Sequence, residues 1–196
     1  MEENLKKIDK RITKTKRLIR NTFVEILKTK KLSDISVTEL AERAEIDRKT
    51  FYYYYATPAS ILEEIENEII TKLEEIFSSE ESTNLEHIFP LINNLLEDDQ
   101  LYLELGKNSR VMNTISLRLK PVLKEIIKRN FAKKAQLSDE KFSVFIEFTT
   151  SGLIGVYLDY LSGKREIPLT EVSEYVTEFF FTDWKTLFSE QKSKNS

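Results

Sequence analysis

Hydrophobic residues recur with the period of an α-helix along most of the chain, and no segment supports a β-strand assignment. From about Lys10 to Lys30, one apolar stripe contains Ile12, Ile19, Phe23, Ile26 and Leu27. The other side of this helix carries cations where a duplex backbone could pass, namely Lys14, Lys16, Arg17 and Arg20. Comparable stripes predict helices over residues 58–77, 85–96, 117–131, 139–162 and 170–188, with short helices on either side of Gly106 and Asn108. Together these patterns predict an all-α protein.

Residues 36–55 predict two short helices separated by a tight turn. Ser36 is placed to cap the first helix, and Asp47 is placed to cap the second. Phe51 and Tyr55 lie four residues apart, so they share one face, which we assign to the core. The remaining polar positions point elsewhere and expose two cations and two phenols, namely Arg48, Lys49, Tyr52 and Tyr53. Such a surface is typical of a helix-turn-helix whose second helix enters the major groove of DNA.

This segment also resembles a known family. Residues 10–62 are similar to the DNA-binding domain of TetR/AcrR transcriptional regulators, and the match is carried by Ile35 to Thr38, Leu40-Ala41 and Ala44 to Tyr55. The aromatic ending Thr-Phe-Tyr-Tyr-Tyr-Tyr is its most specific part. The resemblance implies a second helix, a turn and a recognition helix, followed by a fourth helix that begins near Pro58.

The resemblance also implies roles for individual side chains. The residues expected to contact base edges are Arg48, Lys49, Thr50 and Tyr53. The residues expected to contact phosphates are Thr38, Tyr52 and Tyr54. These roles suit the chemistry, because Arg and Lys pair with guanine O6 and N7, and a threonine methyl group meets the thymine methyl group.

Two positions depart from the family pattern. The family usually has glycine at the turn, where this chain has Glu45, so the turn must form without the residue that adopts positive φ most freely. The family commonly has lysine at the start of the fourth helix, where this chain has Pro58. Thr57 and Pro58 nevertheless form a suitable N-cap and first-turn pair.

Charge is distributed unevenly along the chain. The net charge is −3, but the segment through Tyr55 contains fourteen Lys and Arg against nine Asp and Glu, a net charge of +5. The remainder contains sixteen basic and twenty-four acidic residues, a net charge of −8. A basic N-terminal quarter is expected of a small DNA-binding module, although clusters of Lys and Arg can also simply solvate a helix face.

The two C-terminal helices predict a dimer interface. Ser151, Gly152 and Gly155 form a strip of small residues that would allow another helix to approach closely. The last helix is unusually aromatic, with Phe179, Phe180 and Trp184 among its residues. We expect a four-helix bundle formed with a second copy; the alternative is that both helices are buried within one chain and the glycines relieve an internal crossing.

The predicted domains are residues 1–57, which bind double-stranded DNA, and residues 58–196, which form the dimerisation and effector domain. The resemblance implies a homodimeric repressor released by a small-molecule effector bound after residue 80, where Thr149 and Tyr157 place polar groups on an apolar face. The alternative is that these two residues belong to the ordinary core. The main alternative is a helical protein-interaction module without DNA function.

An all-helical enzyme is disfavoured. The chain has no cysteine and one histidine, His87, so a nucleophile or a transition-metal site lacks its usual residues, and no cofactor is expected. Nucleotide-binding glycine motifs are absent. No window of eighteen apolar residues and no signal-peptide core appear, so the expected location is the cytoplasm, with no membrane partner.

Overall fold

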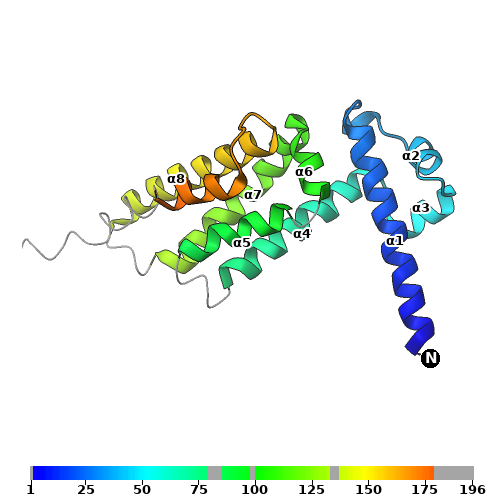
Figure 1. The fold of residues 1–196 in the computed structure, drawn as a ribbon, viewed down its shortest axis with the longest axis horizontal. Helices are drawn as coiled ribbons and strands as arrows, with labels where there is room; N and C mark the ends of the chain where they lie inside the picture. Colours follow the sequence, from blue (N-terminus) through cyan, green and yellow to red (C-terminus); the bar gives the residue numbers. More distant parts are fainter. Residues whose placement is uncertain (1, 79–84, 98–99, 133–136, 179–196) are drawn as a thin grey trace, which may run out of the picture. The chain divides into compact units, whose positions relative to one another are not determined.

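The computed structural model describes residues 2–78, 85–97, 100–132 and 137–178 (Figure 1). The helices are α1 (Glu2–Leu27), α2 (Val37–Arg43), α3 (Arg48–Tyr54), α4 (Pro58–Ser78), α5 (Leu85–Glu97), α6 (Gln100–Gly106), α7 (Ser109–Phe131) and α8 (Asp139–Leu161). A 3₁₀ turn, η1 (Leu32–Asp34), lies between α1 and α2, and residues 169–178 are also helical. These described ranges contain no strand, so the predicted all-α class is confirmed.

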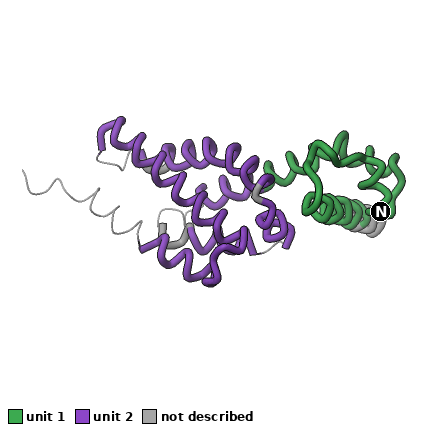
Figure 2. The backbone as a smooth tube through the Cα atoms, turned by 90° about the horizontal axis from the view of Figure 1, so that it is seen from above, with its two compact units in different colours: residues 1–68 green, residues 69–196 purple. Residues whose placement is uncertain are grey.

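The chain divides into two compact units, unit 1 at residues 1–68 and unit 2 at residues 69–196 (Figure 2). The division falls within α4, so this helix contributes its first half to unit 1 and its second half to unit 2. The sequence-based boundary between residues 57 and 58 marks the start of α4 and stays a prediction about functional domains.

Unit 1 is built around a small core of fully buried side chains. The residues in it with no exposed surface come from α1, α2, α3 and α4, and they are Ile19, Phe23, Ile26, Leu40, Phe51, Ile61 and Ile65. Their helical spacing in the sequence predicted most of this stripe. Helix α2 packs against both α1 and α3, so the two short helices are held by the longer α1.

Two helices, α1 and α7, begin earlier than the sequence predicts, and α7 starts at Ser109 rather than near Leu117. Helix α1 begins at Glu2, whereas the prediction places its start near Lys10, although Leu5 and Ile8 continue the helical spacing that leads to Ile12. Helix α5 is continuous from Leu85 to Glu97, so Pro90 does not split it. Pro90 is the sixth residue of α5, so it removes one internal hydrogen bond of the helix without ending it.

Unit 2 has two buried clusters. One joins Phe77 of α4 to α7 and α8, where Ile126, Ile127, Phe142 and Ile146 are buried. The other joins Phe89 and Tyr157 to the helical residues 169–178, through Leu169, Val172 and Val176. Buried apolar side chains thus tie α4, α5, α7, α8 and the described start of the last helix into one body.

Gly106 permits the close approach of α6 and α8. A Cβ atom at this position would lie 2.5 Å from Cβ of Leu161, far inside van der Waals contact. The predicted break at Gly106 and Asn108 is confirmed, because α6 ends at Gly106 and the Asn108 side chain caps α7.

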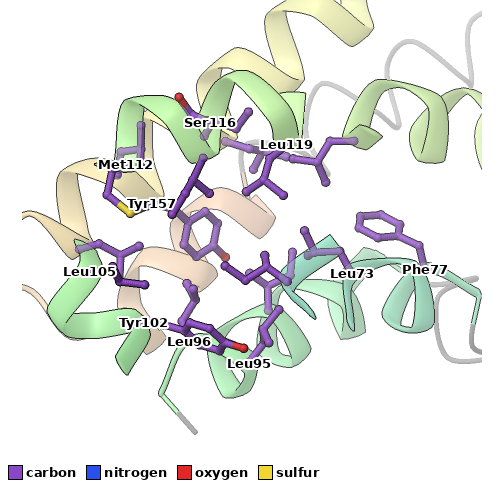
Figure 3. Close-up of a pocket in the computed structure, with 18 of the residues that line it drawn as sticks. Leu73, Phe77, Leu95, Leu96, Tyr102, Leu105, Met112, Ser116, Leu119 and Tyr157 are labelled. Atoms are coloured by element: carbon purple, nitrogen blue, oxygen red, sulfur yellow. The ribbon is translucent and has the colours of Figure 1, made fainter. Parts of the chain in front are cut away.

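Unit 2 also contains a cavity of about 120 Å³ that is partly open to solvent (Figure 3). Helices α4, α5, α6, α7 and α8 all line it, and the surface that faces it is entirely apolar. Representative lining residues, one from each helix, are Leu73, Leu96, Leu105, Leu119 and Leu153. The cavity is therefore a feature of the helical body rather than of a loop.

Candidate nucleic-acid interface

Helix α2 is bounded by two local motifs. At its start, the Ser36 side chain accepts a hydrogen bond from the Glu39 backbone N–H at 3.1 Å, as the capping pattern predicts. At its end, the Glu45 N–H donates to the Glu42 carbonyl oxygen at 3.1 Å, and the Ile46 N–H donates to the Ala41 carbonyl oxygen at 3.0 Å. This pair of bonds is a Schellman motif, which normally places glycine where Glu45 stands.

Glu45 adopts a left-handed backbone conformation with φ of 51°. The turn therefore forms the Schellman motif without a glycine, and Glu45 carries the strain. The direct connection from α2 to α3 is preserved, which fixes the orientation of the second short helix.

We expect Glu45→Gly to be more stable than Glu45→Ala by about 1 kcal/mol, because only glycine relieves the left-handed strain. Urea unfolding followed by circular dichroism measures the difference. Glu42→Gly is the matched control; there glycine replaces a residue inside α2 and is expected to destabilise by about 1 kcal/mol. Equal midpoints for Glu45→Gly and Glu45→Ala would contradict the strain.

Helix α3 begins with a strong side-chain cap. The Asp47 carboxylate accepts from the Thr50 N–H at 2.7 Å and from the Thr50 hydroxyl at 2.9 Å. These bonds, the backbone one first, lower the pKa of Asp47 below its ordinary value. The cap is therefore fully formed above the ordinary pKa of aspartate and is lost as the pH falls through the lowered value.

The buried side of α3 is as predicted. Phe51 has no exposed surface and Tyr55 only 3%, and their ring centroids lie 6.0 Å apart. Burial is the main cause of a raised pKa for the Tyr55 hydroxyl. These two rings hold α3 to the core, so the other side of the helix is free to face outward.

The outward side of α3 carries most of the predicted site. Arg48 and Lys49 are exposed, Tyr52 is 51% exposed and Tyr53 is 75% exposed. Thr38, near the start of α2, is also exposed. Large exposed aromatic side chains are uncommon on a soluble surface unless they serve binding, and here they stand beside two cations.

Two predicted site residues are less accessible. Thr50 is half-buried and its hydroxyl is bonded to Asp47, so its methyl group is the part that remains for contact. Tyr54 is half-buried, and its ring meets the Tyr53 ring edge-on with centroids 5.0 Å apart. Tyr54 thereby supports the position of Tyr53.

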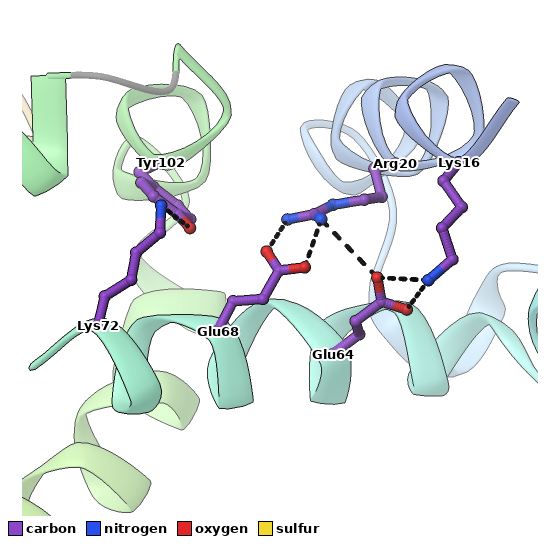
Figure 4. A network of polar contacts seen from close by, with 6 residues as sticks. All are labelled: Lys16, Arg20, Glu64, Glu68, Lys72 and Tyr102. Carbon is purple, nitrogen blue, oxygen red and sulfur yellow. Dashed lines mark hydrogen bonds and ion pairs between the residues drawn. The ribbon is translucent and has the colours of Figure 1, made fainter. Parts of the chain in front are cut away.

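The cations of α1 divide into two groups. Lys14 and Arg17 are exposed, in keeping with the sequence-based expectation of a basic face on α1. Lys16 and Arg20 were expected on that face too, but instead they pair with α4 (Figure 4). A helix carries residues three and four apart on one side, so sequence spacing could not tell which cations face inward.

Arg20 forms a bidentate pair with Glu68. Its Nη1 and Nη2 atoms lie 2.8 and 2.7 Å from the two carboxylate oxygens (Figure 4). Burial alone would lower the pKa of Arg20, but the hydrogen bond and charge of Glu68 outweigh it, and the net shift is upward. Planar bidentate pairs are stronger and more directional than simple ion pairs.

Lys16 forms a second ion pair between α1 and α4. Its Nζ atom lies 3.0 Å from both oxygens of Glu64 and 5.6 Å from the centroid of the Tyr55 ring. Glu64 is therefore a partner of α1. We call Lys16, Arg20, Glu64 and Glu68 the α1–α4 clamp; it fixes α1 to the first half of α4.

The start of α4, which includes Pro58, is capped by side-chain hydrogen bonds. The Ser60 N–H donates to the Thr57 hydroxyl at 3.3 Å, and the Thr57 N–H donates to the Ser60 hydroxyl at 2.9 Å. This reciprocal pair has the geometry of a capping box with serine in the usual place of Glu or Gln. The predicted cap is present, and the lysine that the family commonly has at position 58 is not.

Helix α8 exposes one face to solvent. Ser151, Gly152 and Gly155 are all exposed, and a Cβ atom on either glycine would meet no described atom within 4 Å. On the same side Val144 is 69% exposed and Phe148 is 76% exposed. Within the described part of the chain, the glycines therefore do not relieve an internal crossing. The other predicted interface residues, Phe179, Phe180 and Trp184, lie outside the described residues.

Two further features bear on the class of protein. Among the described residues, no three His, Asp or Glu side chains gather where they could hold a metal ion. Helix α8 is the one described helix long and apolar enough to cross a membrane, but core helices of soluble proteins pass the same test, so this is weak evidence.

Comparison with known proteins identifies the class. A family model described as "Transcriptional regulator C-terminal region" and belonging to the TetR group matches residues 83–182, just over half of the chain. The protein is therefore a member of the TetR/AcrR family of transcriptional regulators. No curated protein matches the sequence.

Solved structures agree in fold. The dihydroxyacetone kinase operon activator DhaS has a TM-score of 0.63 at 16% identity, covering 89% of this chain and 98% of that one. A transcriptional regulator from Aquifex aeolicus VF5 has a TM-score of 0.62 at 18% identity, covering 86% and 99%. The fatty acid degradation regulator FadR from Bacillus halodurans has a TM-score of 0.60 at 13% identity, covering 91% and 96%. At such identities these likenesses establish the shared fold.

Proposed function

We propose that the protein is a cytoplasmic, homodimeric, sequence-specific DNA-binding repressor that a small-molecule effector releases from its operator. The outward side of α3 is the observation that supports the DNA-binding part of this proposal. There Arg48, Lys49 and Tyr53 stand exposed on a helix held by the Asp47 cap and by the buried Phe51. A helix presented in this way can enter a major groove.

The proposed contacts divide between bases and phosphates. Arg48, Lys49 and Tyr53 are proposed to contact base edges, joined by the Thr50 methyl group. Thr38 lies in the first turn of α2, where unpaired N–H groups favour an anion, so it is proposed to contact a phosphate together with Tyr52. Tyr54 is proposed to assist the same phosphate, although its half-buried ring also supports Tyr53.

The exposed face of α8 is proposed as the dimer interface. We call the side of α8 with Val144, Phe148, Ser151, Gly152 and Gly155 the α8 face. It combines two exposed large apolar side chains with a strip on which a helix could approach closely. A two-fold axis brings the same surface of each copy together and would place two recognition helices about 34 Å apart, one turn of DNA.

Effector control is proposed to act through the cavity in unit 2. Of the two polar residues considered from the sequence, Tyr157 lines this cavity and Thr149 does not, although both are buried. A ligand alters DNA binding only if it prefers one of two conformations of the protein. A concave, apolar site of this kind is the usual place for such a ligand.

The salt dependence of DNA binding tests the proposal. Fragments selected from genomic DNA supply the operator, and fluorescence anisotropy gives the affinity at several salt concentrations. The logarithm of the binding constant is expected to fall linearly with the logarithm of salt, by roughly 0.9 for each phosphate neutralised. Lys107→Ala is the control, because Lys107 belongs to unit 2 and pairs with Glu104, so the slope should not change. A binding constant independent of salt would refute the DNA-binding function.

A further inference from the structure

The chemistry of the cavity in unit 2 specifies what it can hold. Nearly all of its lining side chains are aliphatic or aromatic, and no ionisable carboxylate or amine is among them. Three lining residues carry hydroxyl groups, Tyr102, Ser116 and Tyr157. A polar ligand can therefore gain hydrogen bonds in the cavity only if these hydroxyl groups are not already bonded to the protein.

All three hydroxyl groups are engaged with the protein. The Tyr157 hydroxyl donates to Asn93 Oδ1 at 3.3 Å. The Ser116 hydroxyl donates to the Asn113 carbonyl oxygen of its own helix at 2.9 Å. The Tyr102 hydroxyl accepts from Lys72 Nζ at 3.4 Å (Figure 4).

The Tyr157 interaction is part of a short buried chain. Asn93 is 4% exposed, and its Nδ2 atom donates to the Leu169 carbonyl oxygen at 3.2 Å. The Asn93 amide thus uses its oxygen for Tyr157 and its nitrogen for the start of the helix over residues 169–178. Turning the Tyr157 hydroxyl toward a ligand would leave a buried amide oxygen without this partner, which is costly.

We infer that the cavity binds a hydrocarbon group, such as an alkyl chain, whose polar end stays outside the lining. Polar or charged groups placed inside would lose their hydration without compensation, whereas methylene groups gain from burial. An engineered apolar cavity of about 150 Å³ holds benzene, which has six carbons, so by the same proportion this cavity of about 120 Å³ accommodates about five carbons. The inference rests on the proposed function only where it assigns this ligand the role of effector.

The experiment uses two series of straight-chain probes, 1-alkanols and alkanoates of about two to twelve carbons. Isothermal titration calorimetry measures their binding to the full-length protein in the absence of DNA. The dissociation constant is expected to fall about fourfold per added methylene and to level off near five carbons. Both series should show the same dependence on chain length, because the head group does not enter the cavity.

Two substitutions at one lining position make the test specific. Leu119→Phe reduces the cavity and should move the levelling-off point to shorter chains. Leu119→Ala enlarges it and should move that point to longer chains. Leu18→Phe is the matched control, because Leu18 belongs to unit 1 and is 44% exposed, and it should leave the chain-length profile unchanged. A variant that merely loses stability cannot shift the profile in a chosen direction.

The outcomes separate this inference from the proposed function. Absence of binding by every chain, or profiles that both Leu119 variants leave unmoved, would overturn the hydrocarbon site. Chain binding that follows cavity size supports it, whether or not DNA is present. Chains that bind in this way but never release the protein from its operator would retain the hydrocarbon site and contradict its role as effector site.

Discussion

Replacing Gly155 with leucine is expected to convert the dimer to a monomer and to lower operator affinity by about 10²–10⁴-fold. A leucine side chain would stand where close approach of a second helix is proposed, on the α8 face. Two linked DNA-binding units gain that range of affinity from binding two half-sites together, and a monomer loses it. Analytical ultracentrifugation measures the oligomeric state, and anisotropy measures affinity for the operator.

Ser143→Leu is the control for this experiment. Ser143 is exposed on α8 but lies away from the α8 face, so the same leucine should leave the dimer intact. The presence of two glycines within one helix supports the choice of site. Each glycine lowers the stability of the helix by about 1 kcal/mol relative to alanine, and a close contact with a second helix would compensate for this loss. A wild-type monomer at micromolar concentration, or a Gly155→Leu dimer of full affinity, would place the interface elsewhere.

Lys49→Ala and Tyr53→Ala are expected to weaken operator binding by about 1–3 kcal/mol each and to reduce discrimination between the operator and random DNA. Both side chains are exposed on α3 and can reach base edges without rearranging the core. Tyr53→Phe removes only the hydroxyl, so comparing it with Tyr53→Ala separates a hydrogen bond from ring contact. Competition binding with specific and random duplexes measures both affinity and discrimination.

Thr38→Ala and Tyr52→Ala provide the contrast. As proposed phosphate contacts, they should weaken binding to operator and random DNA by the same factor, because phosphates carry no base identity. If all four alanine variants lost affinity equally on both kinds of DNA, the division between base and phosphate contacts would be wrong, while DNA binding itself would stand.

The sequence could predict the parts of the site that depend on local signals. The caps at Ser36 and Asp47 and the burial of Phe51 and Tyr55 follow from neighbours within four residues, and the structure confirms each of them. The sequence also located the turn. Glu45 stands where the family usually has glycine, and it is the residue that adopts the left-handed conformation in the Schellman motif.

The remaining parts depend on contacts that sequence spacing does not encode. Lys16 and Glu64 are forty-eight residues apart, and whether a lysine faces DNA or α4 depends on the rotation of α1 in the fold. The cavity is equally hidden, because Leu119 shows the same helical spacing whether it touches a neighbour or lines a space. The ion pairs and the cavity can therefore be identified only from the packed structure.

The α1–α4 clamp also changes how unit 1 approaches DNA. Residues 1–68 contain fourteen Lys and Arg against thirteen Asp and Glu, a net charge of only +1, because the first half of α4 adds four glutamates. Beyond a Debye length of about 8 Å at physiological ionic strength, such a body is nearly neutral to a duplex. We therefore expect electrostatic steering from a distance to be weak. On the proposed function, the search for an operator would then proceed mainly by free diffusion, with attraction appearing only once α3 is almost in the groove.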